Sequence, residues 1–176
     1  MKSDRVFGLG GRVAAVIGAG SGIGEAVAHG CARQGATVCC LDVNGDAAAA
    51  TAHAIAAEGG MTDAARLDIT DATSVADALD HVVERHGGLD IVVSTPAVNV
   101  RKPILDYTDA DFDRVVGLNL KGSFNVLRAT EAASSSSPRS APRWSNRDSR
   151  SMPRPRPASC SSSGPPRRSS ALPVCG

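Results

Sequence analysis

The 176-residue sequence predicts an α/β fold, a doubly wound parallel sheet with its strands in the order 3-2-1-4 between layers of helices. Three observations predict this class. Short apolar segments of strand length alternate with longer segments of helical periodicity, which is typical of βαβ units. A cluster of glycines follows the first apolar segment, and an aspartate follows each of the next two. Such residues place polar groups at one edge of a parallel sheet.

The first part of the chain alternates strands and helices. Residues 12–17 are an apolar run that stops at Gly18, which is typical of a buried strand. The next segment ends near Gly35 and puts three apolar residues on one helical face: Ile23, Val27 and Cys31. The elements after it are a strand at 37–41, an Ala-rich helix at 46–58 and a weak strand at 64–67.

The following part adds a fourth strand between two helices. Asp71 is placed to cap a helix that Gly87 ends, with an inward face of Val75, Leu79, Val82 and Val83. Residues 89–93 form the fourth strand. A long helix at 112–132 comes next, and its expected inward residues are Val115, Val116, Leu120, Phe124 and Leu127.

The composition changes near Ala133. Residues 1–133 hold 11 Lys or Arg and 17 Asp or Glu, whereas residues 134–176 hold eight Arg and one acid. The second segment also has 14 Ser and eight Pro, and too few apolar side chains to offset the entropy of ordering. We therefore expect a folded domain at 1–133 and a disordered Ser/Pro/Arg-rich tail at 134–176.

Several classes of protein are not expected. No apolar run approaches the roughly 20 residues of a membrane span. The first eleven residues lack the apolar part of a secretory signal, so we expect a cytoplasmic protein. The five cysteines form no CxxC pair and no spacing typical of a zinc site, so no metal site is expected.

A glycine pattern, Gly18-x-x-x-Gly22-x-Gly24, lies between the first strand and the first helix. Glycine there lets the backbone approach a pyrophosphate, to which the helix N-terminus presents free N–H groups and a positive dipole. The same glycines also occur in ordinary tight turns without a ligand. Because a strand precedes them and a helix follows, the pattern favours a Rossmann-type dinucleotide site.

Asp42 ends the second strand, 24 residues after Gly18. A carboxylate there accepts hydrogen bonds from the ribose hydroxyls of an adenosine and repels a 2′-phosphate. No Arg or Lys lies within 18–24 or 38–46, so the pattern favours NAD over NADP. Asp68 ends the third strand, near the expected place of the adenine. The alternatives are a solvated Asp42 and an Asp68 that only introduces the next helix.

These residues resemble the short-chain dehydrogenase/reductase family from about Arg5 to Glu131. The resemblance rests on Gly18-Ala19-Gly20-Ser21-Gly22-Ile23-Gly24, Asp42, Leu67-Asp68-Ile69-Thr70, Leu89-Asp90-Ile91-Val92-Val93 and Asn119-Leu120-Lys121-Gly122. It implies an NAD(P)-dependent oxidoreductase that moves hydride between a secondary alcohol or carbonyl and nicotinamide. The implied cofactor contacts are Gly18, Ser21, Gly22, Ile23, Gly24, Asp42, Val43, Asp68, Ile69, Ser94 and Ala97. Residues 99–103 with Phe112 and Asp113 resemble, more loosely, members that act on sugar acids and polyols.

Two segments depart from the family. Ile17 precedes the first glycine, where Thr is usual, and Ser94-Thr95-Pro96-Ala97 replaces the usual Asn-Asn-Ala-Gly. Ser94 can still hydrogen-bond a neighbouring strand, whereas Pro96 removes a backbone donor.

The resemblance also implies a catalytic Asn, Ser, Tyr and Lys. Asn119 matches the first, although an Asn inside a helix also bonds its own backbone. The one tyrosine, Tyr107, precedes Asn119, and no lysine follows Lys121. The catalytic Ser and Tyr-x-x-x-Lys are therefore absent from this sequence.

The tail resembles a GC-rich gene translated in the wrong frame. A shifted codon takes the third base of one residue and the first two bases of the next. Because Met is always ATG, the codon across Ser151/Met152 ends in AT and permits Tyr. Four codons later, the codon across Pro155/Arg156 permits Lys. Thirteen codons before that Tyr, Pro138/Arg139 permits Ser. The alternative is a genuine basic arm that contacts nucleic acid or is phosphorylated.

Three functions remain open. The chain is a dehydrogenase by family whose chemistry is impaired, a dinucleotide-binding remnant with a basic arm, or a non-functional frameshift product. The expected partners are a nicotinamide dinucleotide and, in the parent family, a small alcohol or carbonyl substrate. Neither a membrane nor a nucleic acid is favoured, and the family's oligomer contacts lie largely in the missing part.

Overall fold

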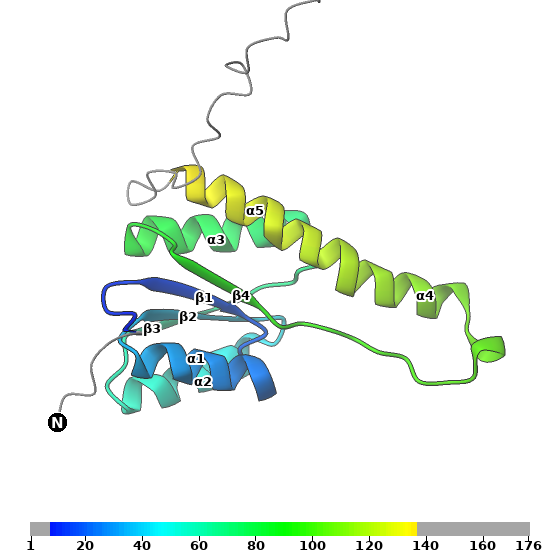
Figure 1. Cartoon of the computed structure of the whole chain (residues 1–176), viewed down its shortest axis with the longest axis horizontal. Coiled ribbons are helices and arrows are strands. Elements are labelled where there is room, and N and C mark those ends of the chain that lie inside the picture. Colours follow the sequence, from blue (N-terminus) through cyan, green and yellow to red (C-terminus); the bar gives the residue numbers. More distant parts are fainter. Residues whose placement is uncertain (1–7, 137–176) are drawn as a thin grey trace, which may run out of the picture. The chain divides into compact units, whose positions relative to one another are not determined.

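The protein, seen as a computed structural model, is described over residues 8–136. Four parallel strands form one sheet in the order β3-β2-β1-β4, which confirms the predicted order (Figure 1). The strands are β1 (Val13–Ile17), β2 (Thr37–Asp42), β3 (Thr62–Arg66) and β4 (Ile91–Ser94). The tail expected at 134–176 lies outside the described residues from position 137 onward.

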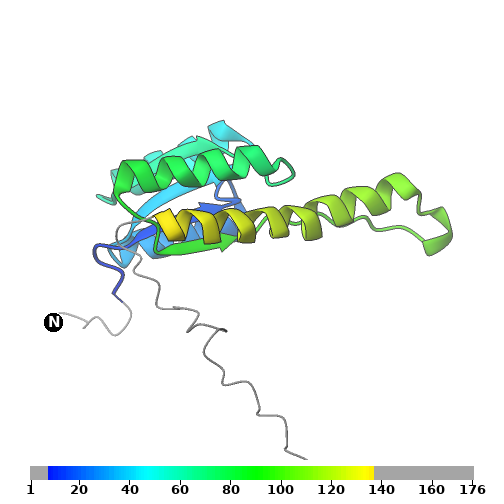
Figure 2. The same cartoon turned by 90° about the horizontal axis from the view of Figure 1, so that it is seen from above.

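Strand β1 is the centre of the fold, and all five of its residues are buried. Val13, Ala15 and Ile17 face one apolar cluster and Ala14 and Val16 face the other. The first cluster includes residues of α3 (Ala72–His86) and α5 (Ser123–Ser136), and the second includes residues of α1 (Gly22–Arg33) and α2 (Gly45–Ala57). The two pairs of helices therefore cover opposite faces of the sheet (Figures 1 and 2).

Helix α3 begins and ends as its sequence predicts. The Asp71 side chain accepts a hydrogen bond from the Thr73 N–H, which satisfies one free donor of the first turn. Gly87 ends the helix in the left-handed conformation with φ 73°. The predicted inward residues, Val75, Leu79, Val82 and Val83, are all buried.

Helix α1 packs on the sheet through small residues. Gly24 and Ala28 are its buried positions, and Val27 and Cys31 are packed at the edge of the core. Ile23, expected on the same face as Val27, is 77% exposed. Small side chains on the inner face let the helix axis approach the strands closely.

The helix expected at 112–132 is three segments. Helix α4 (Asp109–Val116) and α5 are joined by a π-helical segment, η2 (Gly117–Gly122). The prediction that Leu120, Phe124 and Leu127 point inward is wrong, since they are 68%, 58% and 70% exposed.

The inner face of η2 and α5 is built from smaller residues instead. Val126, Ala129 and Ala133 are buried in the core, and Gly122 is buried against Ile69. Residues 122, 126, 129 and 133 follow helical spacing, so small side chains bring α5 close to α3. The wide turns of η2 also rotate α5 relative to α4, which shifts the apolar stripe away from a regular α-helical pattern.

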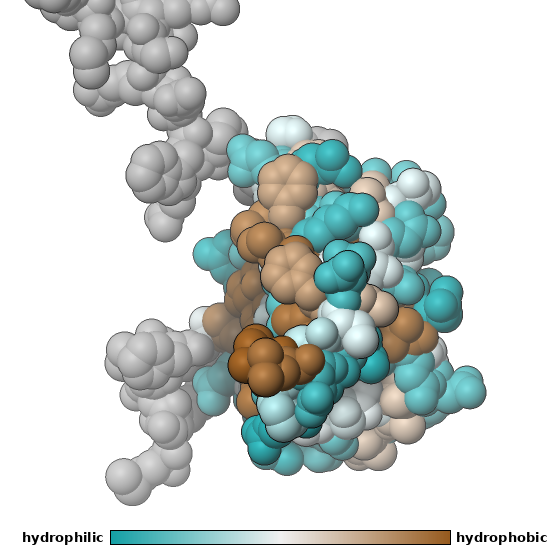
Figure 3. All heavy atoms as spheres, turned by 90° about the vertical axis from the view of Figure 1, so that its right-hand side faces the viewer, coloured by the Kyte–Doolittle hydropathy of each residue, from teal (hydrophilic) through white to brown (hydrophobic). Residues whose placement is uncertain are grey.

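Large apolar side chains are exposed on the part of the chain that extends beyond the sheet. This part carries a 3-10 turn, η1 (Ile104–Asp106), and helix α4. Figure 3 shows apolar side chains gathered on the face that this extension presents. The exposed residues on η1, α4, η2 and α5 are Ile104, Leu105, Phe112, Leu120, Phe124 and Leu127.

Residues 8–136 contain neither a membrane-spanning helix nor a metal-binding cluster. No helix there is long and apolar enough to cross a membrane. In the same residues, no group of three or more His, Cys, Asp or Glu is arranged to hold a metal ion.

Two leucine substitutions test this packing. Leu79→Ala should lower the free energy of unfolding by about 2–5 kcal/mol, because it empties a fully buried position. Leu127→Ala, the matched change at an exposed position, should alter it by less than about 0.5 kcal/mol. Urea denaturation followed by circular dichroism measures both. Equal losses would mean that Leu127 lies inward, as its sequence pattern predicts.

Candidate functional site

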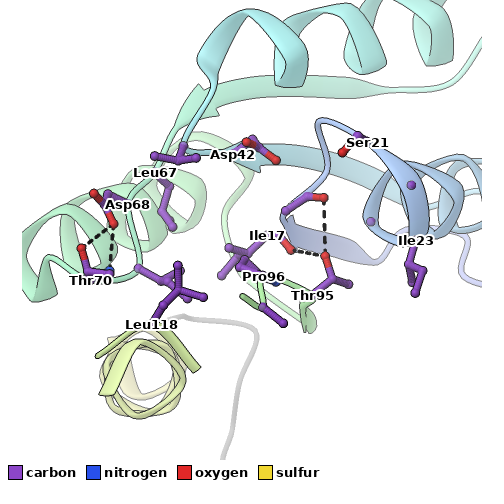
Figure 4. A pocket seen from close by; sticks show the side chains of 16 residues that line it. Ile17, Ser21, Ile23, Asp42, Leu67, Asp68, Thr70, Thr95, Pro96 and Leu118 are labelled. Atoms are coloured by element: carbon purple, nitrogen blue, oxygen red, sulfur yellow. Dashed lines mark hydrogen bonds between the residues drawn. The ribbon is translucent and has the colours of Figure 1, made fainter. Parts of the chain in front are cut away.

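A cavity of about 570 Å³ opens at the carboxyl edge of the sheet. Its walls come from the residues that follow β1, β2, β3 and β4, with Leu118 of η2 on one side (Figure 4). In a doubly wound parallel sheet, ligands bind at this edge.

The cavity collects most of the predicted site residues. It is lined by Gly18, Ser21, Gly22, Ile23, Gly24, Asp42, Val43, Asp68, Ile69 and Ala97. Ser94 and Asn119 do not line it. Sequence reasoning missed six of its residues, namely Ile17, Leu67, Thr70, Thr95, Pro96 and Leu118.

The turn between β1 and α1 depends on glycines for its conformation and its packing. Gly18 and Gly22 have φ values of 85° and 58°, in the left-handed region that favours glycine. A Cβ on Gly24 would lie 1.9 Å from the Gly18 carbonyl oxygen, so only glycine fits there. The two segments therefore meet backbone to backbone, and α1 begins directly at the cavity.

The first turn of α1 has N–H groups with no preceding helical carbonyl. The Ser21 side chain, at the N-cap, makes no capping hydrogen bond. The N–H groups of Gly18 and Ala19 are already committed, since both donate to the Leu41 carbonyl of β2. The turn is thus fixed to β2. The N-terminus of the 12-residue helix α1 presents N–H donors and the positive end of the helix dipole to the cavity.

Asp42 links this turn to the end of β2. Its Oδ2 accepts the Gly20 N–H at 2.9 Å, and its Oδ1 accepts the Asn44 N–H at 2.9 Å. A Cβ on Gly20 would lie 2.9 Å from the Asp42 carboxylate, so glycine is needed for this contact as well. Each carboxylate oxygen retains a lone pair for a further donor.

Arg66 is a basic residue beside Asp42 that lies outside the two segments, 18–24 and 38–46, in which the sequence has no Arg or Lys. It pairs with Asp42 in the parallel register of β2 and β3. Its Nε donates to the Val43 carbonyl at 3.2 Å, so the guanidinium lies over the corner where β2 ends. The register of two strands brings together residues that are distant in the sequence.

Asp68 is held by its own loop. Its Oδ1 accepts the Thr70 hydroxyl at 2.7 Å and the Thr70 N–H at 2.9 Å. The hydrogen bond from the Thr70 hydroxyl, followed by that from the Thr70 backbone, lowers the pKa of Asp68 below its ordinary value. The side chain is therefore ionised at neutral pH, and it fixes the loop after β3 that forms one wall of the cavity.

Thr95 ties the end of β4 to the glycine turn. Its hydroxyl donates to the Ile17 carbonyl at 3.1 Å and lies 3.5 Å from the Gly18 carbonyl (Figure 4). The sequence assigned a contact of this kind to Ser94, whose residue is exposed and pairs with Ile17 through the register of β1 and β4. The hydroxyl beside the glycine turn thus belongs to the next residue.

Asn119 lies in η2 and bonds a different segment. Its side-chain oxygen accepts the Val98 N–H and its amide nitrogen donates to the Val98 carbonyl, both at 2.9 Å. The alternative that Asn119 bonds its own helix is therefore wrong. The pair fixes η2 against the segment that follows Ala97, and π-helical turns of this kind are frequent at functional sites.

A family model described as short chain dehydrogenase matches residues 12–136. The chain belongs to the short-chain dehydrogenase family. It is 36% identical to D-threitol dehydrogenase of Mycolicibacterium smegmatis and 34% identical to sorbitol dehydrogenase of Cereibacter sphaeroides, over 72% and 71% of this chain. A solved short-chain type dehydrogenase/reductase of Mycobacterium marinum matches with a TM-score of 0.70 at 33% identity, over 73% of this chain and 52% of that one.

The chain spans about half the length of the curated relatives that it matches, covering 48% of each of these two dehydrogenases. A hydroxysteroid dehydrogenase of Escherichia coli is similar in the same way, with a TM-score of 0.68 at 33% identity, over 72% of this chain and 53% of that one. The shared half is the one that holds the sheet and the cavity described above.

Tyr107, the one tyrosine of the sequence, lies away from the cavity lining. Its hydroxyl donates to the Val100 carbonyl. The Lys102 ammonium lies 5.5 Å from the centre of its ring and is itself paired with the Asp111 carboxylate. Both side chains thus hold the segment before α4 together.

Two glycine substitutions in α1 test the close contact at the cavity. Gly24→Ala should lower the free energy of unfolding by about 1–3 kcal/mol, because its Cβ collides with a backbone oxygen that cannot move freely. Gly30→Ala, in the same helix but with nothing near its Cβ position, should raise it by about 0.5–1 kcal/mol. Urea denaturation measures both. A neutral Gly24→Ala would contradict the contact.

Proposed function

We propose that the cavity binds a nicotinamide dinucleotide, NAD in preference to NADP. The observation that carries the proposal is the joint presence, in one cavity, of a glycine-rich turn at a helix N-terminus and of Asp42 at the end of the adjacent strand. These two features fit the two polar parts of the adenosine half of a dinucleotide.

The pyrophosphate fits the turn between Gly18 and Gly24. The donors of the first turn of α1 and the helix dipole favour a negative group there. Gly22 is exposed with open space at its Cβ position, whereas Gly18, Gly20 and Gly24 let the turn pack closely on its neighbours. Ser21, Gly22 and Ile23 would line the pyrophosphate from the helix side.

The adenosine fits the side of the cavity formed by β2 and β3. Asp42 has lone pairs free to accept the ribose hydroxyls, while its charge repels a 2′-phosphate. Val43, Asp68 and Ile69 would surround the adenine. Ser94 and Ala97, at the end of β4, would lie on the nicotinamide side.

The class of reaction follows from the family. Bound NAD supplies a hydride acceptor, and the proposed parent reaction is hydride transfer between a secondary alcohol or carbonyl and nicotinamide. Two relatives bear the names of polyol dehydrogenases, which favours polyols as substrates of the parent protein. Asn119, the residue that matches the family's catalytic Asn, would be held in place by its two hydrogen bonds to Val98.

This chain itself is proposed to be catalytically impaired. The sequence has no tyrosine after Tyr107 and no lysine after Lys121, so the Tyr-x-x-x-Lys pair of the family is absent from it. The Asn119 amide is no substitute, because a neutral amide does not titrate near pH 7. A frame change near residues 131–137 remains our explanation for the tail.

A second candidate function is a dinucleotide-binding remnant with a basic arm. The observation behind it is the charge of residues 134–176, which hold eight arginines against one acid. The third candidate, a non-functional frameshift product, makes no use of the arm. The nucleotide sequence around codons 128–140 distinguishes a natural frameshift from a genuine arm.

Cofactor choice depends on two opposite charges at the end of β2. The unchanged protein should bind NAD about tenfold more tightly than NADP, because the charged hydrogen bonds of Asp42 suit a ribose hydroxyl and oppose a phosphate. Asp42→Ala should lower the ratio of NAD to NADP affinity. Arg66→Ala should raise this ratio, since Arg66 is the cation beside Asp42 at the end of β2. Isothermal titration with both cofactors measures the ratio. Equal affinities in the unchanged protein would contradict the preference.

Activity should depend on the part of the sequence after Ala133. The chain should show no appreciable turnover of polyols, sugar acids or secondary alcohols with NAD, because a general acid/base contributes about 10²–10⁴-fold in rate. A frame-restored chain, with the lost codons, should recover activity. Absorbance of NADH at equal protein concentration compares the two. Similar turnover by both would show that an unrecognised group performs the proton transfer.

A further inference from the structure

Four residues from three elements fix the glycine turn. From β2, the Leu41 carbonyl accepts two N–H groups of the turn and Asp42 accepts the Gly20 N–H. From α2, the buried Thr51 hydroxyl donates to the Ala19 carbonyl at 2.9 Å. From the far side, Thr95 reaches the turn from the end of β4 (Figure 4). The Leu41 carbonyl holds the N–H of the peptide between Ile17 and Gly18, and Thr95 holds the carbonyl of the same peptide.

The contacts of Thr95 converge on the peptide between Ile17 and Gly18. Its N–H donates to the Ile17 carbonyl at 3.0 Å, and its hydroxyl donates to the same oxygen at 3.1 Å. One carbonyl is thus held by two donors of one residue. The orientation of this peptide determines where the Gly18 carbonyl points, and that carbonyl is the group on which Gly24 packs.

The Thr95 hydroxyl also fills the space that the glycines leave. A Cβ on Gly18 would lie 2.4 Å from this oxygen, and a Cβ on Gly24 would lie 2.8 Å from it. The ring of Pro96 closes the other side of Gly18, with its Cδ 3.2 Å from the same Cβ position. Proline also fixes its own φ, so the segment that carries Thr95 is stiff.

The hydroxyl that bonds the start of the turn belongs to Thr95, directly after β4, and β1 ends without a hydroxyl side chain. Ile17, which precedes the first glycine, buries its side chain in the core at 1% exposure and offers only its carbonyl. Thr95, which directly follows the adjacent strand β4, supplies the donor. The two departures from the family pattern, at Ile17 and at residues 94–97, therefore meet at one hydrogen bond.

We infer that Thr95 is a positioning residue for the dinucleotide site. Its hydroxyl fixes the Ile17 and Gly18 carbonyls, and through them the approach of Gly24 that aims the N-terminus of α1 into the cavity. The inference rests on the proposed function for the ligand, but the fixing of the turn is a property of the free protein.

Three variants of the full chain separate the hydroxyl from the packing. Thr95→Val keeps the shape and removes the hydroxyl, whereas Thr95→Ser keeps the hydroxyl and removes a methyl group. Thr130→Val is the matched control, because the Thr130 hydroxyl donates to the Val126 carbonyl within α5, far along the chain from the turn. NAD affinity by titration and amide hydrogen exchange of residues 18–24 without ligand are measured for each, with urea denaturation to correct for the folded fraction.

Thr95→Val should weaken NAD binding and speed exchange in residues 18–24 by roughly threefold to tenfold each, the effect of losing one hydrogen bond. Thr95→Ser and Thr130→Val should both stay within about twofold of the unchanged protein. A Thr95→Val variant that fails to fold, beside a Thr95→Ser variant with normal exchange in the turn, also supports the role of the hydroxyl.

Two results would overturn the inference. One is a Thr95→Val protein with lower global stability but unchanged exchange in the turn and unchanged affinity, which is a structural role only. The other is a Thr95→Ser protein as impaired as Thr95→Val, which assigns the effect to the methyl group. If the unchanged protein binds no NAD, the proposed function fails, and exchange in the turn still decides whether Thr95 fixes it.

Discussion

Helix α1 comes closest to the end of strand β1 where two backbone segments meet at Gly18 and Gly24. Gly24 packs on the Gly18 carbonyl at a distance that leaves no room for a Cβ. This contact sets the angle at which α1 leaves the sheet, and therefore the direction of its N-terminus. Because Gly24 packs so closely on Gly18, the first turn of α1 lines the cavity, and its N–H groups lie near the end of β2. A side chain at either glycine would collide with its neighbours and push the helix outward.

A turn made of glycines has high conformational entropy, so its order must come from its neighbours. The surrounding elements supply it with hydrogen bonds to backbone groups: Asp42 to an N–H, and the hydroxyls of Thr51 and Thr95 to carbonyls. Asp42 belongs to β2, Thr51 to α2, and Thr95 directly follows β4. The site is consequently as rigid as the packing of β1 between β2 and β4.

Charge at the cavity is arranged along the sheet edge. Asp42 and Asp68 follow neighbouring strands, and Arg66 lies between them at the end of β3. The Thr70 hydroxyl turns Asp68 toward its own loop, which leaves Asp42 as the carboxylate bound to the turn itself. Asp42 lines the cavity, whereas the exposed Arg66 lies beside this corner without lining the cavity.

The sequence by itself determined the strand order, the caps of α3 and the glycine turn with Asp42. These depend on local chemistry: apolar runs of strand length, an aspartate before a helix, and glycine where backbone must meet backbone. It did not determine the inner face of α5, because small residues such as Ala129 and Ala133 pack there while Phe124 and Leu127 point outward. Only the tertiary structure decided the neighbours of the site, since strand register places Arg66 beside Asp42 and the end of β4 brings Thr95 to the glycine turn, which no local pattern encodes.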